Sequence, residues 1–425
     1  MTKKKVLSLF SGCGGMDIGF EGKFMVPVTC INQDIHQDWI TQTKGDFGEL
    51  RETIFKIAFA NDILEPAQKA WSSYFKKYGY NGTTFHLGSI VDLVKAHKEG
   101  KYKFPNNIEV VTGGFPCQDF SVSGKRKGFK SDKCHNGDKL TIGEATAENR
   151  GQLYLWMKQV IEITKPKVFI AENVKGLISL GDAKKVIETD FSQIDKDGYL
   201  VVPAKVLFAG DYGVPQRRER IIFFGFNKKH LRPEALKALS KSVIPEEYDP
   251  YPIKTHYEPN GNGQLSLCNK FSNLKPYVPT REVLKDLLEP ELALDDLSQQ
   301  HFSKAKFCGK TQGQTEINPN GLAPTIRAEH HGNIEYRRLS VKNGGKILEE
   351  LEKGLPERRL TVRECARFQT FPDDFMFVQN GNGNGKNYTI SASSAYKLIG
   401  NAVPPLLAYH IAKRLESLWD KLFVD

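Results

Sequence analysis

A short apolar run near the start of the chain stops abruptly at a glycine-rich turn, and this junction limits the folds open to the sequence. The run Val6-Leu7-Ser8-Leu9-Phe10 has the length of a buried strand, and Ser11-Gly12-Cys13-Gly14-Gly15 follows it directly. Residues 16–20 can then begin a helix. Strand, glycine turn and helix open a nucleotide-binding βαβ unit, so the sequence predicts an α/β fold. Asp17 stands where a dinucleotide fingerprint needs its third glycine, so the turn suits a nucleoside without a pyrophosphate; a tight structural turn is the alternative.

Later apolar runs also end in polar side chains. Residues 56–63 form such a run and contain Asp62 near their end, where a carboxylate can accept the hydroxyls of a ribose. Asp62 can also cap a helix, and the two roles are compatible. Asp34 is a weaker candidate for the same strand end, because residues 23–56 show no clear period. Residues 84–90 predict a third strand with Ser89 at its polar end.

A further strand, residues 167–171, leads into Glu172-Asn173-Val174. Open α/β sheets bind ligands at the carboxyl ends of their strands, so Glu172 is a candidate site residue; a helix-capping pair is the alternative. Two more strands, at 205–209 and 220–225, flank a turn that contains Arg217, Arg218 and Arg220. These arginines indicate either a solvated turn or an anchor for phosphate, carboxylate or a base carbonyl.

A cysteine follows the apolar residues 108–112 in a loop that can expose a nucleophile. In Gly113-Gly114-Phe115-Pro116-Cys117-Gln118, the glycines permit close approach and the proline fixes the chain just before Cys117. A buried structural cysteine is the alternative. The long, glycine-containing and basic connection over 118–148, before a helix at 155–164, predicts a mobile lid.

Composition limits the partners and the compartment. The 425 residues include 60 Lys and Arg against 50 Asp and Glu, a net charge of +10 that is compatible with a polyanionic partner. The seven cysteines are scattered, which argues against zinc and a disulfide scaffold and predicts a reduced, cytoplasmic protein. We expect neither a signal peptide nor a membrane span.

The character of the chain changes near residue 229. Up to about 358 it is polar and rich in Asn, Gly, Pro and Lys, which predicts a separate, irregular domain whose amide and guanidinium groups suit base edges in a groove. Thr361 and Glu364 then form a capping box for a helix that we expect to end at Phe371-Pro372. The last helix carries apolar positions 407, 411 and 415 on one face, and the first domain's sheet is the expected partner of that face. The predicted units are 1–228, 229–358, a connecting segment 359–389 and a returning segment 390–425.

Eight short motifs in this order resemble the C5-cytosine-specific DNA methyltransferases of bacterial restriction-modification systems. They are Phe-x-Gly-x-Gly at 10–14, Asn-Asp-Ile at 61–63, Gly-Phe-Pro-Cys-Gln at 114–118, Arg-Gly-x-Leu at 150–153, Glu-Asn-Val at 172–174, Gln-Arg-Arg-Glu-Arg at 216–220, Arg-Leu-Thr-x-Arg-Glu at 359–364 and Gly-Asn-Ala-Val at 400–403. The departures are the extra segments 23–56 and 130–148, and Ser89, where many members carry an aspartate.

The resemblance implies a Rossmann-like, mostly parallel sheet with helices on both faces, and a target-recognition domain inserted before the C-terminal helix. It implies transfer of a methyl group from S-adenosylmethionine to C5 of a flipped-out cytosine in duplex DNA. Cys117 would be the nucleophile, Glu172 the general acid, and Arg220 and Arg218 would hold the ring and nearby phosphates. The residues implied for the cofactor are Phe10, Ser11, Gly12, Gly14, Gly15, Asp62, Ile63, Ser89, Ile90, Gly114, Pro116, Leu153, Asn401 and Val403. Those implied for DNA are Gln118, Ser121, Ser123, Lys125, Arg126 and Arg327, and no metal is expected.

Three other functions would share some of these features. A tRNA cytosine methyltransferase shares the catalytic set, but the long segment 229–358 favours duplex DNA of defined sequence. An NAD-dependent oxidoreductase would leave the Pro-Cys and Glu-Asn pairs without a role, and a DNA-binding module without activity would not need every catalytic position filled. We expect a monomer that pairs in function with a restriction endonuclease.

Overall fold

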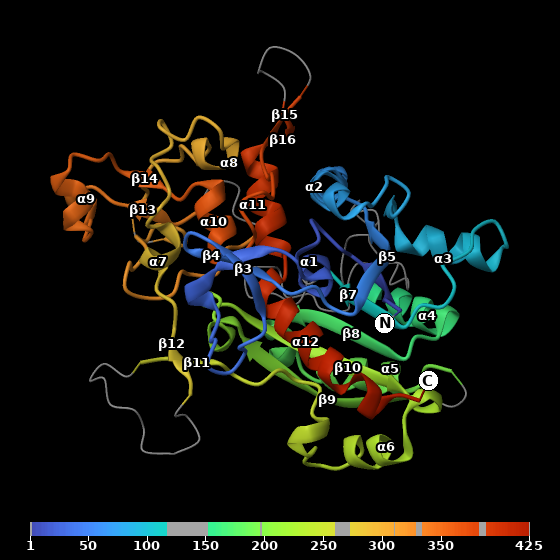
Figure 1. Cartoon of the computed structure of the whole chain (residues 1–425). Coiled ribbons are helices and arrows are strands. Elements are labelled where there is room, and N and C mark those ends of the chain that lie inside the picture. Colours follow the sequence, from blue (N-terminus) through green and yellow to red (C-terminus); the bar gives the residue numbers. More distant parts are fainter. Residues whose placement is uncertain are drawn as a thin grey trace.

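A seven-stranded sheet runs through the centre of the molecule (Figure 1). The computed structural model describes residues 2–116, 152–195, 198–259, 273–309, 311–328, 334–381 and 388–424. The strands, in their order across the sheet, are β6 (Phe85–Leu87), β5 (Phe55–Asp62), β1 (Lys4–Leu9), β7 (Val110–Gly114), β8 (Val168–Val174), β10 (Glu219–Asn227) and β9 (Tyr199–Phe208).

One strand of this sheet is reversed. Neighbours from β6 to β8 pair in parallel, whereas β10 pairs antiparallel with both β8 and β9. The reversal brings the amino-terminal end of β10 beside the carboxyl ends of β1, β5, β7 and β8. Side chains from five strands therefore gather at this end of the sheet.

Helices cover both faces of the sheet, and the alternation of side chains along each strand divides the core in two. On β1, Val6 belongs to one buried cluster and Leu7 to the other. The first cluster contains apolar residues of α1 (Gly15–Glu21), α2 (Glu65–Phe75), α6 (Pro233–Leu239) and α12 (Pro405–Leu422), and the second those of α3 (Ile90–Lys98), α4 (Leu153–Thr164) and α5 (Ala183–Ser192). The predicted α/β architecture is confirmed.

The extra segment 23–56, which has no clear period of apolar residues, contains a small antiparallel sheet. Its strands are β2 (Met25–Pro27), β4 (Phe47–Leu50) and β3 (Ile40–Lys44), in that order. Asn32 donates a side-chain hydrogen bond to the carbonyl of Thr255 at 2.9 Å, and Lys285 pairs with Asp46 at 2.8 Å. The segment thus connects the first domain to the region that follows residue 254.

The residues that directly follow β10 still pack against the first domain. Ala235 and Leu239 of α6 are buried in the same cluster as α12, and Arg414 of α12 donates to the carbonyl of Asp249 at 2.8 Å. Packing against the first domain therefore continues past residue 229.

Short elements dominate the stretch from 255 to 401. They are β11 (His256–Tyr257), β12 (Lys275–Pro276), α7 (Thr280–Leu284), α8 (Leu297–Gln300), β13 (Tyr336–Arg338), α9 (Leu348–Glu352), β14 (Arg358–Arg359), α10 (Val362–Phe368), β15 (Gln379–Asn380), β16 (Tyr388–Ile390) and α11 (Ala392–Asn401). The capping box of α10 is present, with Thr361 Oγ1 accepting from the Glu364 amide at 3.0 Å, but the helix ends at Phe368, before the predicted end.

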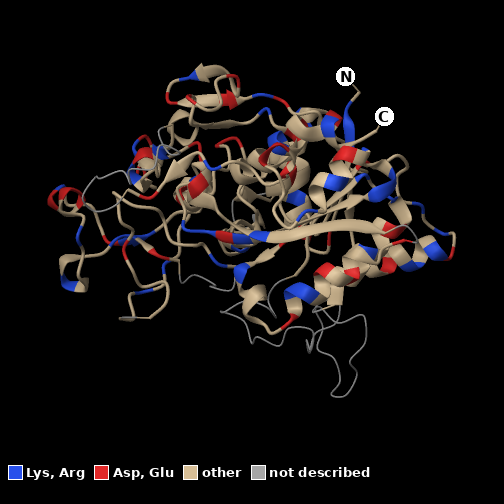
Figure 2. Cartoon of the chain, turned by 90° about the horizontal axis from the view of Figure 1, so that it is seen from below, with Lys and Arg blue, Asp and Glu red and all other residues tan. Residues whose placement is uncertain are grey.

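Buried ion pairs organise much of this stretch. Arg338 is fully buried and pairs with Glu289 and Glu350, and Arg358 pairs with Glu289 and Glu364. Figure 2 shows basic and acidic residues side by side through this part of the molecule, on the left. The sequence of this stretch lacks a sustained apolar period, and these ion pairs link its short elements.

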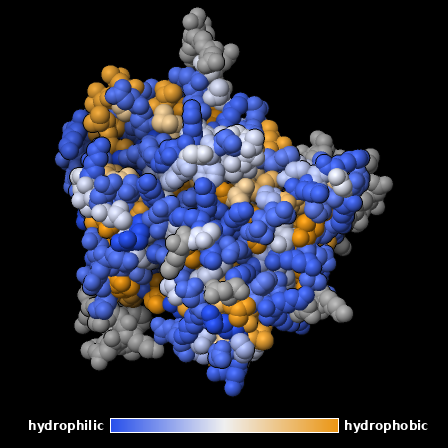
Figure 3. Space-filling model, turned by 45° about the vertical axis from the view of Figure 1, so that its right-hand side comes forward, coloured by the Kyte–Doolittle hydropathy of each residue, from blue (hydrophilic) through white to orange (hydrophobic). Residues whose placement is uncertain are grey.

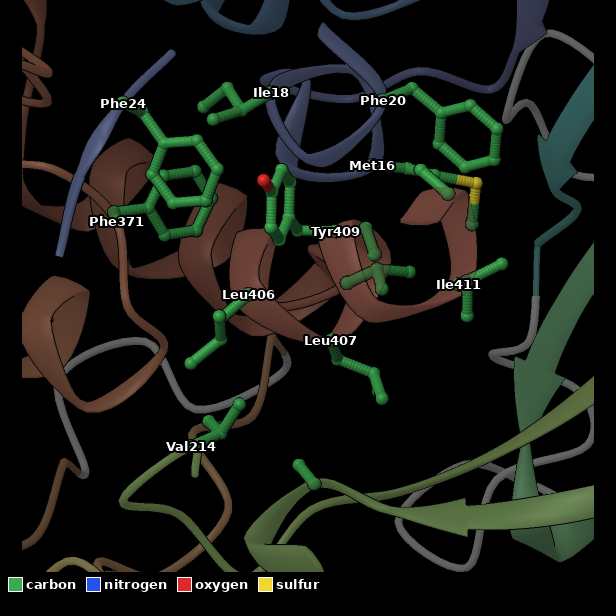
Figure 4. Packing of buried hydrophobic residues seen from close by; sticks show 14 of the residues in the cluster. Met16, Ile18, Phe20, Phe24, Val214, Phe371, Leu406, Leu407, Tyr409 and Ile411 are labelled. Carbon is green, nitrogen blue, oxygen red and sulfur yellow. The ribbon is translucent and has the colours of Figure 1, made fainter. Parts of the chain in front are cut away.

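The C-terminal helix packs chiefly on α1, whereas the sequence predicted the sheet as its partner. Leu407, Ile411 and Leu415 are fully buried, and Trp419 contacts Phe55 of the sheet with ring centroids 5.6 Å apart. Figure 4 shows Tyr409 rising from α12 toward α1. The two helices cross closely because Gly19 has no side chain: a Cβ there would lie 2.5 Å from Ala408 Cβ and 2.6 Å from the carbonyl oxygen of Pro405.

The face seen in Figure 3 is mostly hydrophilic, with hydrophobic residues in small, separate patches. Every helix within the described ranges is too short or too polar to cross a membrane.

The crossing of α1 and α12 yields a stability prediction. Gly19→Ala should destabilise the fold by about 1–3 kcal/mol, because the added methyl group meets backbone atoms of α12 that cannot turn away. Thermal unfolding measures the loss. Gly82→Ala is the control, since a Cβ there would have no neighbour within 4 Å. Equal midpoints for the two variants would contradict the close crossing.

Candidate active site

A cavity of about 900 Å³ opens at the carboxyl ends of the parallel strands. Its walls come from the turn after β1, the ends of β5, β7 and β8, the start of β10, the loop 325–328 and the end of α11. Segments from both ends of the chain therefore meet around one space.

Glu172 and Arg220 form an ion pair in this cavity. Arg220 Nε lies 2.7 Å from Glu172 Oε1, and both side chains are 9% exposed. In the antiparallel ladder, Arg220 is opposite Val174 and Ile222 is opposite Glu172, so the two charged residues are diagonal neighbours on one face. Burial raises the pKa of the Glu172 carboxyl above its ordinary value, and the charges of Arg220 and Arg218 oppose that rise. Glu172 is therefore a candidate proton donor beside a fixed cation.

The neighbouring strand leaves room for this carboxylate. Gly114 of β7 pairs with Glu172, and a Cβ at Gly114 would lie 2.8 Å from Glu172 Oε2. Asn173, on the opposite face of β8, donates to the carbonyl of Phe115 at 3.1 Å. This hydrogen bond holds the chain after β7 close to Glu172. The next residue, Pro116, lines the cavity.

Asp62 organises the other end of the cavity. Its carboxylate accepts hydrogen bonds from the amides of Gly12 and Leu64, each at 2.9 Å. Burial raises its pKa, while these amides favour the charged form. The next side chain, Ile63, is 45% exposed and lines the cavity, where it can cover a flat ring. Asp34, the weaker candidate, does not line the cavity and pairs with Lys275 at 3.7 Å.

The structure brings together most of the residues that the sequence singled out. The predicted residues that line the cavity are Phe10, Ser11, Gly12, Gly15, Asp62, Ile63, Ser89, Ile90, Gly114, Pro116, Leu153, Glu172, Arg220, Arg327, Asn401 and Val403. Cys117, Gln118, Ser121, Ser123, Lys125 and Arg126, and the expected lid, lie outside the described residues.

Two predicted residues lie elsewhere. Gly14 does not line the cavity; it precedes α1 with φ +87°, and a Cβ there would lie 2.6 Å from Trp71 Cδ1, so its small size serves the packing of α2. Arg218 is fully buried behind the cavity wall, where its guanidinium donates to backbone carbonyls. This position corrects the expectation that Arg218 contacts the ring or a phosphate.

The cavity also contains side chains that sequence reasoning missed. Lys397 of α11 lines it, and its charge lowers the pKa of Asp62. Thr325 lines it beside Arg327, and its hydroxyl donates to the carbonyl of Arg217. The only available signal for Lys397 was its place one helical turn before Gly400.

Two solved structures share this fold. The Entamoeba histolytica methyltransferase EhMeth superposes with a TM-score of 0.54 over 99% of each chain, at 16% identity. The S. pombe Dnmt2 methyltransferase gives a TM-score of 0.52 over 98% of this chain and 99% of its own, also at 16% identity.

Sequence comparisons identify the family. The Type II methyltransferase M.BsuRI of Bacillus subtilis is 31% identical over 418 residues, which cover 98% of this chain and 80% of that protein. M.BspRI of Lysinibacillus sphaericus is 30% identical over 430 residues, or 97% and 81% of the two chains. The family model for C-5 cytosine-specific DNA methylase matches residues 4–417. With this match across nearly its whole length, the chain belongs to the C5-cytosine-specific DNA methyltransferases.

Proposed function

We propose that this methyltransferase acts on a cytosine flipped out of duplex DNA, with Cys117 as the covalent nucleophile and Glu172 and Arg220 as the groups that hold and protonate the ring. The observation that carries the proposal is the buried Glu172–Arg220 pair at 2.7 Å, in one cavity with Asp62 and Ile63. The family match favours DNA over the tRNA alternative.

The chemistry explains why these groups are needed together. C5 of cytosine is too weak a nucleophile to take a methyl group until a nucleophile adds at C6. The thiolate of Cys117 would form that C6–S bond, while the protonated carboxyl of Glu172 gives its proton to N3 and prevents charge from building on the ring. Burial, which raises the pKa of Glu172, supports this acid role.

Arg220 fixes the acid and leaves donors for the ring. Its Nε pairs with Glu172 and its Nη1 donates to the carbonyl of Glu219, so further guanidinium hydrogens are available for O2 of the base. After C5 takes the methyl group, a water molecule would take the C5 proton as the Cys117 thiolate leaves C6, and N3 would return its proton to Glu172, which restores the aromatic ring and the acid. The base must leave the stack for these contacts to form.

The cavity fits S-adenosylmethionine, which supplies an electrophilic methyl group when bound. A Cβ at Gly12 would have no neighbour within 4 Å, so the turn after β1 leaves open space beside the Asp62 carboxylate. Asp62 would accept the ribose hydroxyls and Ile63 would cover the adenine, with Asn401 and Val403 closing the wall. The expectations of a monomer and of a paired restriction endonuclease stay predictions.

Covalent trapping tests the proposed reaction. A duplex with 5-fluorocytosine at the target should give a denaturation-resistant adduct with the wild-type enzyme, because fluorine cannot leave as the proton does. Cys117→Ser should give no adduct. A stable adduct in that variant would place the nucleophile at another residue. Bisulfite sequencing of DNA from cells that express the enzyme identifies the target site.

A second prediction concerns the space beside Glu172. Gly114→Ala should slow methyl transfer by about 100-fold, because the added methyl group displaces the carboxylate from its place beside Arg220. Single-turnover rates measure the loss. Adding Gly114→Ala to Glu172→Gln should cost much less than it does alone, since both changes act on one group. Independent, multiplicative losses would show that Gly114 acts through something other than Glu172.

A third prediction concerns the cofactor. Asp62→Ala should weaken S-adenosylmethionine binding by about 1–3 kcal/mol, because hydrogen bonds to a charged group are lost. Isothermal calorimetry measures the affinity, and binding of DNA without cofactor should barely change. Asp34→Ala is the matched control, since Asp34 lies outside the cavity. Wild-type cofactor affinity in Asp62→Ala would remove Asp62 from the site.

A further inference from the structure

The loop 323–328, here called the recognition loop, is hydrogen-bonded directly to the chain that leads into β10. The amide of Arg217 donates to the carbonyl of Ala323 at 2.8 Å, and the amide of Ala323 donates to the carbonyl of Pro215 at 3.0 Å. The Thr325 hydroxyl adds a bond to the carbonyl of Arg217. The recognition loop therefore continues the wall that β10 begins.

Arg218 joins this loop to a third segment. Its Nη1 donates to the carbonyl of Ile326 at 3.2 Å, and its Nη2 donates to the carbonyls of Gly400 at 2.9 Å and Ala402 at 2.6 Å. The side chain is fully buried. These three hydrogen bonds of the Arg218 side chain are here called the joint. A guanidinium presents several donors in a fixed plane, which an ammonium does not, so the joint specifically requires arginine.

The end of α11 is shaped for the same contact. A Cβ at Gly400 would lie 2.5 Å from the amide nitrogen of Ala328 and 2.6 Å from the carbonyl carbon of Arg327. Only a glycine allows the recognition loop to pack this closely on the helix. On the other side of the joint, Arg220 follows Arg218 by two residues and holds Glu172.

We propose that Arg218 is a positioning residue that ties the recognition loop to both walls of the catalytic cavity, so that correct docking of DNA on the loop controls the placement of the Glu172–Arg220 pair. This inference rests on the proposed function, in which that pair acts on the target base. A wrong base pair that shifts the loop would move the walls with it and slow the chemistry. Without the joint, a shifted loop would leave the walls in place, and wrong sites would be methylated relatively faster.

The test compares single-turnover methylation of the cognate duplex with that of duplexes changed at one base pair of the site. Arg218→Lys keeps the charge but cannot reach all three carbonyls, and Gly400→Ala pushes the loop off α11 with Arg218 intact. Both variants should lose discrimination between cognate and altered duplexes by about tenfold. Arg232→Lys is the control, because Arg232 also donates to a carbonyl, that of Asp420 at 2.8 Å, but outside the joint.

Equal slowing on every duplex, with discrimination unchanged, would overturn the proposal and leave Arg218 a purely structural residue. If Arg218→Lys does not fold, Gly400→Ala alone decides, since it retains the arginine.

The pH profile separates the charge of Arg218 from its hydrogen bonds. Glu172 must be protonated to act as an acid, so the rate falls as pH rises through its pKa. The charge of Arg218 lowers that pKa, so Arg218→Met should move the fall to higher pH, whereas Arg218→Lys should not. Loss of discrimination in Arg218→Met but not in Arg218→Lys would assign the effect to charge and overturn the joint. Failure of the wild-type enzyme to form the 5-fluorocytosine adduct would instead refute the proposed function, whatever the discrimination ratios.

Discussion

The close crossing of α1 and α12 is the contact on which the rest of this structure depends. The chain leaves the first domain after Asp249, forms the short elements between residues 255 and 401, and must return to complete the cavity with Asn401 and Val403. It returns because α12 buries a broad apolar face, and each large side chain removed from water contributes about 1.5–3 kcal/mol. Gly19 permits the two helices to approach closely enough for that burial. This contact and the hydrogen bonds from Arg218 to the carbonyls of Gly400 and Ala402 together position the walls supplied by α11 and by the segment after it.

A second constraint is the direction of β10. Had β10 been parallel to β8, its amino-terminal residues would lie at the opposite edge of the sheet, far from Glu172. The antiparallel register places Arg220 diagonal to Glu172 and leads the preceding residues, including Arg218, to the recognition loop. One reversed strand thus serves both the chemistry and the attachment of the region that follows.

Buried ion pairs accompany the apolar core in the stretch from 255 to 401. Arg338 and Arg358 share Glu289, and Arg367 pairs with both Asp286 and Asp373. Taking such charges out of water is costly, and their attraction offsets that cost only where each donor has a partner. The network is therefore weak evidence for added stability, but it links short elements that also contribute apolar residues to the main buried cluster.

The sequence by itself determined the local features: the strand and glycine turn at 6–15, the strand that ends at Asp62, the capping box at Thr361 and the apolar face of α12. These follow from side-chain periods and capping groups within a few residues of one another. Short motifs also led to the family, and through it to most of the side chains that line the cavity.

Only the tertiary structure decided which of those residues face the cavity. Gly14 and Arg218 belong to motifs, yet one packs against Trp71 and the other donates to carbonyls 108 and 182 positions away. The small sheet of residues 25–50 and the attachment of α6 were also missed, because their strands and helix are short and their partners lie elsewhere in the chain. A local pattern states what a residue can do, but its partners depend on which distant segments the folded chain brings beside it.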